Sequence, residues 1–368
     1  MTNDDLVELS NLPLGGGDDN SATTAPTEKR EKTRKPLGGA KSQYKAKLNV
    51  RGSNKSSPNS LAMNQLHLDD PSPVFVNEPS VLLVEKTLHK VQLQRLKEYR
   101  QPVYIPTMAK SSFQARDDDF FLLMDKVNEF LKSERQVMLI LGDSGAGKST
   151  FNMNLELGLL QAYKSGDPIP LFINLPSIRD PEDDMIGKQL KAHGFSKAQI
   201  LNLKEHRQFI LICDGYDESQ LTTNLHTSNS FNCAGQWSVK LIISCRTQYL
   251  GQDYHGRFVP QRGSHYRRRT LALFQEAIIA PFSKNQIRNY VGQYVPLKPR
   301  TWTIQNYMEK LTTIPNLLNL VKNPFLLTLA LETLPDVTEG KVDLSAVLVT
   351  RVQLYDIFVE HWLDVNKR

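Results

Sequence analysis

The stretch that follows the apolar run 136–141 has the residue types and spacing of a loop that binds phosphate. It fits the pattern G-x-x-x-x-G-K-[ST] and consists of Gly142, Asp143, Ser144, Gly145, Ala146, Gly147, Lys148, Ser149 and Thr150. Glycines leave the backbone N–H groups open to an anion, and the helix expected next directs its positive end to the same point. Lys148 would reach the β- and γ-phosphates, and the Ser149 hydroxyl would bind Mg²⁺. The loop is therefore predicted to bind a nucleoside triphosphate with its metal ion.

Acidic residues follow a second apolar run, 208–213. The run is nearly continuous, which indicates a strand buried on both faces of a parallel sheet. Asp214 comes at its carboxyl end, where α/β sheets bind ligands, and is predicted to bind the metal ion held by Ser149. Asp217 and Glu218 follow closely enough to reach an attacking water. Either one could polarise this water or act as the catalytic base, and the sequence does not choose between them.

Arginines that could bind phosphate lie next to two further apolar runs. Arg246 ends the run 239–245, and its fork of donors suits the oxygens of a γ-phosphate, although it could instead pair with a neighbouring carboxylate. The triplet Arg267–Arg269 precedes 270–274, which is predicted to be a further strand. This triplet could touch phosphate or a partner, or it could be a solvated charge run.

Helices are needed to hold these strands in place. Apolar residues at helical spacing predict helices over 120–131, 148–163 and 185–203, the last one broken near Gly194. Ser196 can cap its second piece, and the acidic residues 117–119 are predicted to cap the helix from Phe120. An extended stretch over 102–108 and a strand over 168–175 are also expected. The rest of the chain is predicted to be helical over 283–294, 304–314, 315–321, 326–334 (stopped by Pro335) and 344–366.

The predicted elements divide the chain into four parts. Residues 1–70 have no sustained apolar period and are predicted to be a disordered basic tail. Residues 71–115 hold a helix from Pro79 to Arg100 and a linker. Residues 116–282 form the domain with the phosphate loop. Residues 283–368 form a helical subdomain that could include the start of a winged helix. On the last helix, the apolar face is expected to consist of Leu348, Val352, Tyr355, Phe358 or Val359, and Trp362.

Charge and cysteine content indicate where the protein works. The formal net charge is +6, and the basic residues between Lys29 and Lys55 alone exceed it. This segment could bind nucleic acid or an anionic membrane, or it could be a solvated tail. No apolar run approaches the ~20 residues that span a bilayer, and the N-terminus is acidic. Together with three cysteines without metal-ligand spacing, this predicts a cytoplasmic protein that is neither secreted nor membrane-spanning.

In combination, these motifs resemble a NACHT-type nucleotide-binding domain of the signal-transducing NTPases with numerous domains. The resemblance covers residues 136–366 and rests on the phosphate loop, the segment from Asp214 to Glu218, the strand before Arg246, the segment 281–287 and the segment 323–327. It implies an α/β fold of the P-loop NTPase type, with a mostly parallel sheet sandwiched by helices and followed by an all-α helical subdomain.

The resemblance also implies a function. ATP, ADP and Mg²⁺ would be the ligands of a slow hydrolysis switch that rests with ADP and self-associates with ATP. Pro324 would pack beside the adenine, although Asn323 stands where many relatives have a Gly-x-Pro sequence. No internal period of a sensory repeat array is visible, and the sequence predicts neither the activating signal nor the protein partners.

Two other classes of function fit parts of the sequence, and a third is disfavoured. A P-loop kinase or another ATPase would also use the phosphate loop, and a kinase could use Arg267–Arg269 as phosphate clamps. A nucleic-acid- or membrane-binding module would work through residues 29–55 and use the nucleotide domain as a scaffold. A GTPase of the Ras type is disfavoured, because the sequence has no Asn-Lys-x-Asp segment to recognise guanine.

Overall fold

The computed structural model describes residues 81–98, 103–116, 119–252, 254–261, 271–298, 302–336 and 350–366. The chain falls into two units, 1–72 and 73–368, and every described residue belongs to the second. The predicted disordered tail, with its basic segment 29–55, lies outside the described residues, as does the triplet Arg267–Arg269. The finer division into domains stays a prediction.

The centre of the second unit is a 7-stranded sheet with the order β2-β1-β7-β3-β6-β5-β4. Five neighbouring strands pair in parallel, as the sequence predicts: β3 (Val137–Gly142), β4 (Ile169–Asn174), β5 (Gln208–Asp214), β6 (Ser238–Arg246) and β7 (Phe274–Ile279). The short strands β1 (Met108–Lys110) and β2 (Phe121–Leu122) add an antiparallel edge. Because β3, β5 and β6 run in the same direction, the residues that follow them meet at one edge of the sheet.

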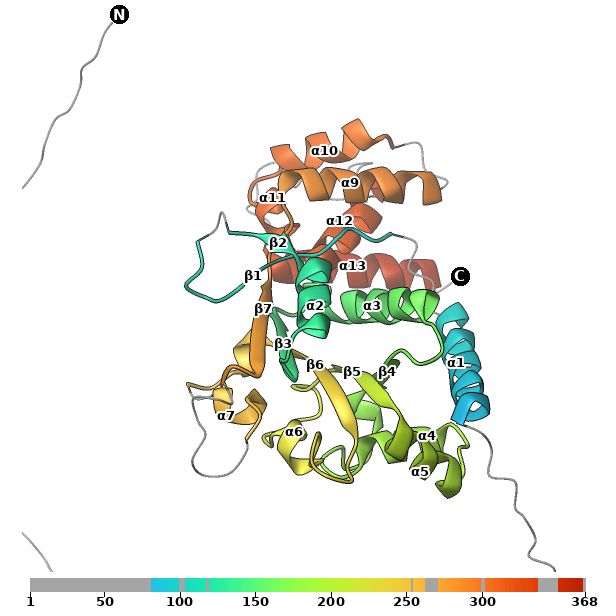
Figure 1. Ribbon diagram of the computed structural model, residues 1–368. Helices are drawn as coiled ribbons and strands as arrows, with labels where there is room; N and C mark the ends of the chain where they lie inside the picture. The colour runs from blue at the N-terminus through green and yellow to red at the C-terminus, as the bar shows by residue number, and fades with distance from the viewer. Residues whose placement is uncertain are drawn as a thin grey trace, which may run out of the picture. The chain divides into compact units, whose positions relative to one another are not determined.

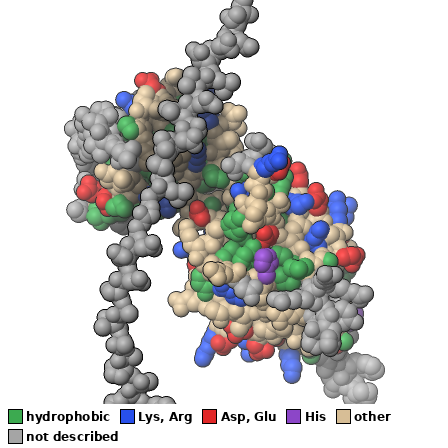
Figure 2. All heavy atoms as spheres, turned by 90° about the vertical axis from the view of Figure 1, so that its left-hand side faces the viewer, with side chains coloured by type: hydrophobic (Ala, Val, Ile, Leu, Met, Phe, Trp, Pro, Cys, Tyr) green, Lys and Arg blue, Asp and Glu red, His purple; other side chains and the backbone are tan. Residues whose placement is uncertain are grey.

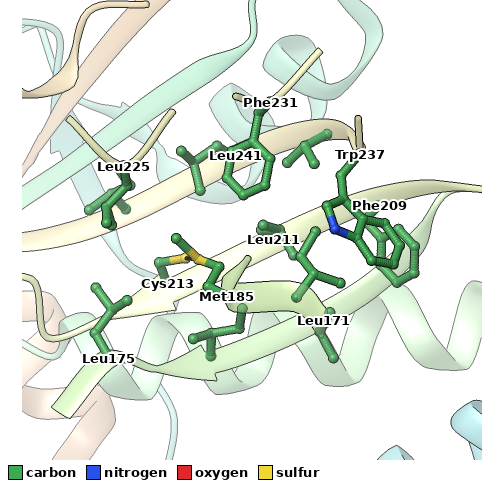
Figure 3. Close-up of a cluster of buried hydrophobic side chains, with 14 of the residues drawn as sticks. Leu171, Leu175, Met185, Phe209, Leu211, Cys213, Leu225, Phe231, Trp237 and Leu241 are labelled. Carbon is green, nitrogen blue, oxygen red and sulfur yellow. Dashed lines mark hydrogen bonds between the residues drawn. The ribbon is translucent and has the colours of Figure 1, made fainter. Parts of the chain in front are cut away.

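Helices cover both faces of the sheet, which explains the continuous apolar strands. Side chains of β3 alternate between two cores, with Leu139 facing one and Ile140 facing the other. Figure 1 shows α2 (Leu123–Lys132) and α3 (Lys148–Ala162) over one face. The other face packs against α4 (Met185–Ala192), α5 (Lys197–His206), α6 (Leu225–Ser228) and α7 (His255–Phe258). Figure 3 shows its core, where Trp237 packs edge-on against Phe209.

Two sequence predictions around the sheet are wrong. The helix predicted to start at Phe120 begins at Leu123, and Leu122 is its N-cap without a side-chain hydrogen bond. Residues 121 and 122 pair with β1 and Leu123 N–H donates to the carbonyl of Thr107, so tertiary pairing keeps this stretch extended. The strand predicted at 270–274 begins only at Phe274, where it pairs with Val137. The cap predicted for Ser196 is confirmed as a capping box with Gln199.

Within the described part of the chain, short 3₁₀ helices link larger elements. They are η1 (Leu175–Ser177) after β4, η2 (Thr247–Tyr249) after β6 and η3 (Val295–Leu297) after α9. The turn at η2 directly follows Arg246, so the chain leaves the sheet immediately after that arginine.

The helical subdomain has a core of its own. It consists of α9 (Lys284–Tyr294), α10 (Ile304–Thr313), α11 (Leu317–Leu320), α12 (Pro324–Asp336) and α13 (Arg351–Asn366). Ser283 and Thr303 start α9 and α10 with capping boxes. Pro335 does not stop α12, because it lies in the last turn, where the loss of one N–H removes a single helical bond.

The predicted apolar face of the last helix is largely wrong. Leu354 is buried and Phe358 packs against the helical core, whereas Val352, Tyr355 and Val359 are exposed. Residue Leu348 and the side chain of Trp362 lie outside the described part of the chain. The face of α13 that contacts α12 is therefore rotated from the predicted one.

An N-terminal helix, α1 (Val81–Glu98), docks on the sheet domain through buried charges. Glu85 accepts hydrogen bonds from Arg207 and from the Tyr163 hydroxyl, and Arg95 pairs with Glu156 on α3. The side chain of Glu85 is only 3% exposed and that of Arg207 is 9% exposed. Removing one partner of such a pair is strongly destabilising, because the other charge then stays buried without compensation.

We expect Arg207→Met to lower the free energy of unfolding by about 3 kcal/mol, because it leaves the Glu85 carboxylate buried without its cation. Chemical denaturation measures this loss. Adding Glu85→Met should recover most of it, because the buried charge is then gone as well. The exposed pair Lys126–Glu129 supplies a control, since Lys126→Met should cost less than about 1 kcal/mol. A double variant as unstable as the single one would contradict the interpretation.

The three cysteines are all free thiols. Cys213 and Cys245 are buried in β5 and β6, and Cys233 is exposed. Burial raises the pKa of the Cys245 thiol to about 12, so it is uncharged at neutral pH. Across the described ranges, no cluster of His, Cys, Asp or Glu has the arrangement of a metal site, and no helix is long and apolar enough to cross a membrane.

Candidate nucleotide site

The phosphate loop joins β3 to α3 in the conformation that its glycines permit. Gly145 and Gly147 have φ angles of 76° and 91°, which non-glycine residues rarely adopt. Gly147 is the N-cap of α3 and has no side-chain bond to the first helical N–H groups. The open end of this helix therefore supplies backbone donors and a positive partial charge beside the loop.

Lys148 closes over the loop from the first turn of α3. Its Nζ donates to the carbonyls of Gly142 at 2.8 Å and Asp143 at 3.0 Å. Burial lowers the pKa of Lys148, and the negative charge of Asp217 opposes that shift. The ammonium group is thus held where the loop meets the acidic residues of β5. Ser149, next in the chain, is exposed and able to offer its hydroxyl.

Asp214 is held at the end of β5 by two neighbouring side chains. Its Oδ1 accepts from Asn152 Nδ2 at 2.7 Å and from the Ser244 hydroxyl, and the residue is 9% exposed. Asn152 comes from α3 and Ser244 from β6. The carboxylate therefore has a fixed orientation. The oxygens of Ser149 and Asp214 are the hard ligands that Mg²⁺ prefers, so these residues fit the predicted metal ion.

Arg246 brings the two predicted catalytic acids together. Its Nε lies 3.0 Å from Asp217 Oδ2, and its Nη2 lies 2.7 Å from Glu218 Oε1. Its backbone N–H also donates to Asp217 Oδ1 at 2.9 Å. In this structure, Arg246 therefore makes the carboxylate pairing that the sequence left as the alternative to γ-phosphate binding.

Asp217 and Glu218 have different environments. The side chain of Asp217 is 6% exposed, and both of its oxygens face Arg246. The side chain of Glu218 is 53% exposed and lines a cavity beside the phosphate loop. Of the two carboxylates, that of Glu218 is the more accessible to a water molecule.

That cavity has a volume of about 290 Å³ and lies between the loop and the helical subdomain. Loop residues 144–150 line it together with Glu218, Arg246 and Pro324. Its apolar wall includes Val103, Ile105, Phe282, Tyr290 and Phe325. Gly142 and Asp143 line a neighbouring cavity of about 540 Å³, which Pro324 also borders. Most of the predicted site residues are thus brought to one pocket, which both polar and apolar side chains line.

Several residues of the site were not predicted from the sequence. Asn152 and Ser244 are buried polar residues in elements whose other buried residues are mostly apolar. A polar residue among such apolar neighbours was the signal that the sequence offered. The segment 103–107 was expected only to be extended, yet it lines the pocket and Tyr104 N–H donates to Gln293 Oε1 at 3.3 Å. Its sequence gives no sign of this role.

Strand β3, the phosphate loop, α3 and the aspartate at the end of β5 give the chain the fold of the P-loop NTPases. No protein-family model matches the sequence. An uncharacterized WD repeat-containing protein of Nostoc sp. (strain PCC 7120) is 26% identical over 242 residues. The match covers 59% of this chain and spans 15% of that relative's length.

Among solved structures, a Walker-type ATPase of Pyrococcus abyssi is similar at 13% sequence identity and a TM-score of 0.36. The likeness covers 68% of this chain and 75% of that chain.

Proposed function

We propose that the protein is a NACHT-type molecular switch in signalling that binds ATP and hydrolyses it slowly, resting with ADP and becoming active with ATP. One observation carries the proposal: the phosphate loop and the first turn of α12 line the same pocket. A nucleotide there would contact both the sheet domain and the helical subdomain. Its presence or absence would therefore affect the contact between them, as a switch requires.

Mg²⁺ would be held by the Ser149 hydroxyl and the Asp214 carboxylate. When bound, the metal neutralises charge on the phosphates. Lys148 and the N–H groups of the loop would bind the phosphate oxygens. Asn152 and Ser244 would keep Asp214 oriented toward the metal ion, because both donate to the same carboxylate oxygen.

Hydrolysis requires a base near the terminal phosphate. Glu218 fits this role because its carboxylate lines the pocket and is half exposed. In the structure, this carboxylate is paired with Arg246. Asp217 would position Arg246 from the protein side, since it binds both the backbone and the side chain of that arginine.

Arg246 is the residue that would distinguish bound ATP from bound ADP. A γ-phosphate would offer its guanidinium a partner that ADP lacks. Arg246 would then leave Glu218 and bind the phosphate, which frees the carboxylate for the attacking water. A ligand shifts a conformational equilibrium only through such a differential contact.

The alternative functions rest on parts of the chain outside the described residues. The kinase hypothesis needs Arg267–Arg269 as clamps, and the binding-module hypothesis needs residues 29–55. On the described surface seen in Figure 2, basic and acidic side chains are interspersed. That face does not resemble the continuous basic surface with which proteins bind nucleic acid.

The oligomeric state with each nucleotide tests the switch. We expect the purified protein to carry ADP and to have the mass of a monomer in light scattering. Exchange for a non-hydrolysable ATP analogue with Mg²⁺ should produce a larger species, because the proposal links ATP to self-association. An unchanged mass with bound analogue would contradict the switch. ATP consumption that depends on a small acceptor would favour the kinase.

A further inference from the structure

The helical subdomain contacts the phosphate loop through the residues that start α12. Asn323 Nδ2 donates to the carbonyl of Ser144 at 2.8 Å, and Phe325 N–H donates to the carbonyl of Gly145 at 3.2 Å. These bonds join segments nearly 180 residues apart, as the separation of 179 between Asn323 and Ser144 shows. Two consecutive carbonyls of the loop are therefore held by the subdomain.

Asn323 has a second role at the same point. Its Oδ1 accepts from the N–H groups of Phe325 at 3.1 Å and Leu326 at 3.2 Å. This is the bonding of an N-cap, and Pro324 follows in the position that favours proline. A single side chain thus caps α12 with its oxygen and binds the loop with its nitrogen, so the helix start and the loop have a fixed separation.

The surroundings of Gly145 show how closely the start of α12 approaches the phosphate loop. A Cβ at this position would be 2.7 Å from Asn323 Oδ1 and 2.8 Å from Phe325 Cβ. Gly147 also has a positive φ, yet a Cβ there would meet nothing within 4 Å. The glycine at 145 is therefore required by the approach of α12 as well as by its backbone conformation.

The bond to Ser144 also fixes the orientation of a peptide group. The carbonyl of Ser144 and the N–H of Gly145 belong to one planar trans peptide, so they point in opposite directions. Holding the carbonyl toward α12 turns the N–H of Gly145 away from α12. Backbone N–H groups are what a phosphate loop offers its ligand, so Asn323 restricts one of them before a nucleotide arrives.

We propose that Asn323 is a positioning residue that orders the phosphate loop from the helical subdomain and thereby couples nucleotide affinity to the docking of α12. The proposal rests on the proposed nucleotide function. Coupling of this kind is reciprocal: if docking raises nucleotide affinity, nucleotide stabilises docking by the same factor. Nucleotide should therefore slow hydrogen exchange in the first turn of α12 as well as in the loop.

Asn323→Ser separates the two roles of this side chain. Serine still caps the helix but has no amide nitrogen to reach Ser144. We expect Asn323→Ser to bind ADP roughly 3- to 10-fold more weakly in calorimetry, the value of one lost hydrogen bond. Without nucleotide, the amides of residues 143–147 should exchange faster than in the wild type, which loss of a helix cap alone would not produce.

Thr303→Ala is the matched control, because Thr303 caps α10 in the same subdomain and does not line the pocket. It should lower stability and leave ADP affinity unchanged. If Asn323→Ser binds ADP as the wild type does, the coupling is refuted while the nucleotide function stands. If the wild type binds neither ADP nor ATP, the nucleotide function fails and the coupling fails with it.

Discussion

Lys148→Ala is expected to abolish the thermal stabilisation of the protein by ATP or ADP with Mg²⁺. Lys148 is the side-chain cation of the phosphate loop, and its Nζ already lies over the loop, bound to the carbonyls of Gly142 and Asp143. Without it, the loop itself would offer the phosphates only its backbone donors. For the wild type, ligand at about 100 times its Kd adds about 2.7 kcal/mol of stability. The variant should show none of this gain in thermal denaturation.

The control for this prediction is Lys322→Ala. Lys322 is exposed and lines the neighbouring cavity with Gly142 and Asp143, but it does not line the pocket beside the loop. A general loss of positive charge near the loop would affect both variants, whereas loss of a specific phosphate ligand affects only Lys148→Ala. Stabilisation that persists in Lys148→Ala would refute the assignment of the loop.

The strand, loop and helix over 137–162 could be predicted because their sequence pattern is local. Strand, glycines, lysine and helix are consecutive in the sequence, so one pattern specifies the structure and the site. Asp214 was also placed correctly at the carboxyl edge of the sheet, because buried apolar runs of this kind form parallel strands. These predictions needed no knowledge of which segments meet.

Contacts between distant segments could not be predicted in the same way. Asn152, Ser244 and Asn323 each bind the site through a partner far away in the chain. The start of α2 was wrong for a similar reason, because pairing with β1 overrode the helical pattern. A single sequence specifies periodicity and turns, but it does not specify which strand edge or helix face a segment will contact.

The charge cluster of Arg246, Asp217 and Glu218 could be predicted only in part. The sequence placed Arg246, Asp217 and Glu218 at strand ends and left open whether the arginine binds phosphate or carboxylate. The structure shows the carboxylate pairing. It also distinguishes the two acids by exposure, a property that depends on tertiary packing.

Glu218→Gln is expected to slow ATP hydrolysis by about 10²- to 10⁴-fold while nucleotide binding is retained, because the amide cannot accept a proton from the attacking water. Single-turnover hydrolysis measures the rate, and calorimetry measures the affinity. The substitution is nearly isosteric and the side chain is half exposed, so stability should change by less than about 0.5 kcal/mol.

Asp217→Asn is the matched variant, and it should behave differently. Its amide keeps one acceptor for Arg246 but loses the charge opposite the guanidinium, at a side chain that is only 6% exposed. We expect lower stability and a smaller reduction of the hydrolysis rate than in Glu218→Gln, because Arg246 is displaced but the base remains. The opposite ranking of the two rates would make Asp217 the base and Glu218 only a partner of Arg246. Full activity in both would remove the acidic pair from the reaction.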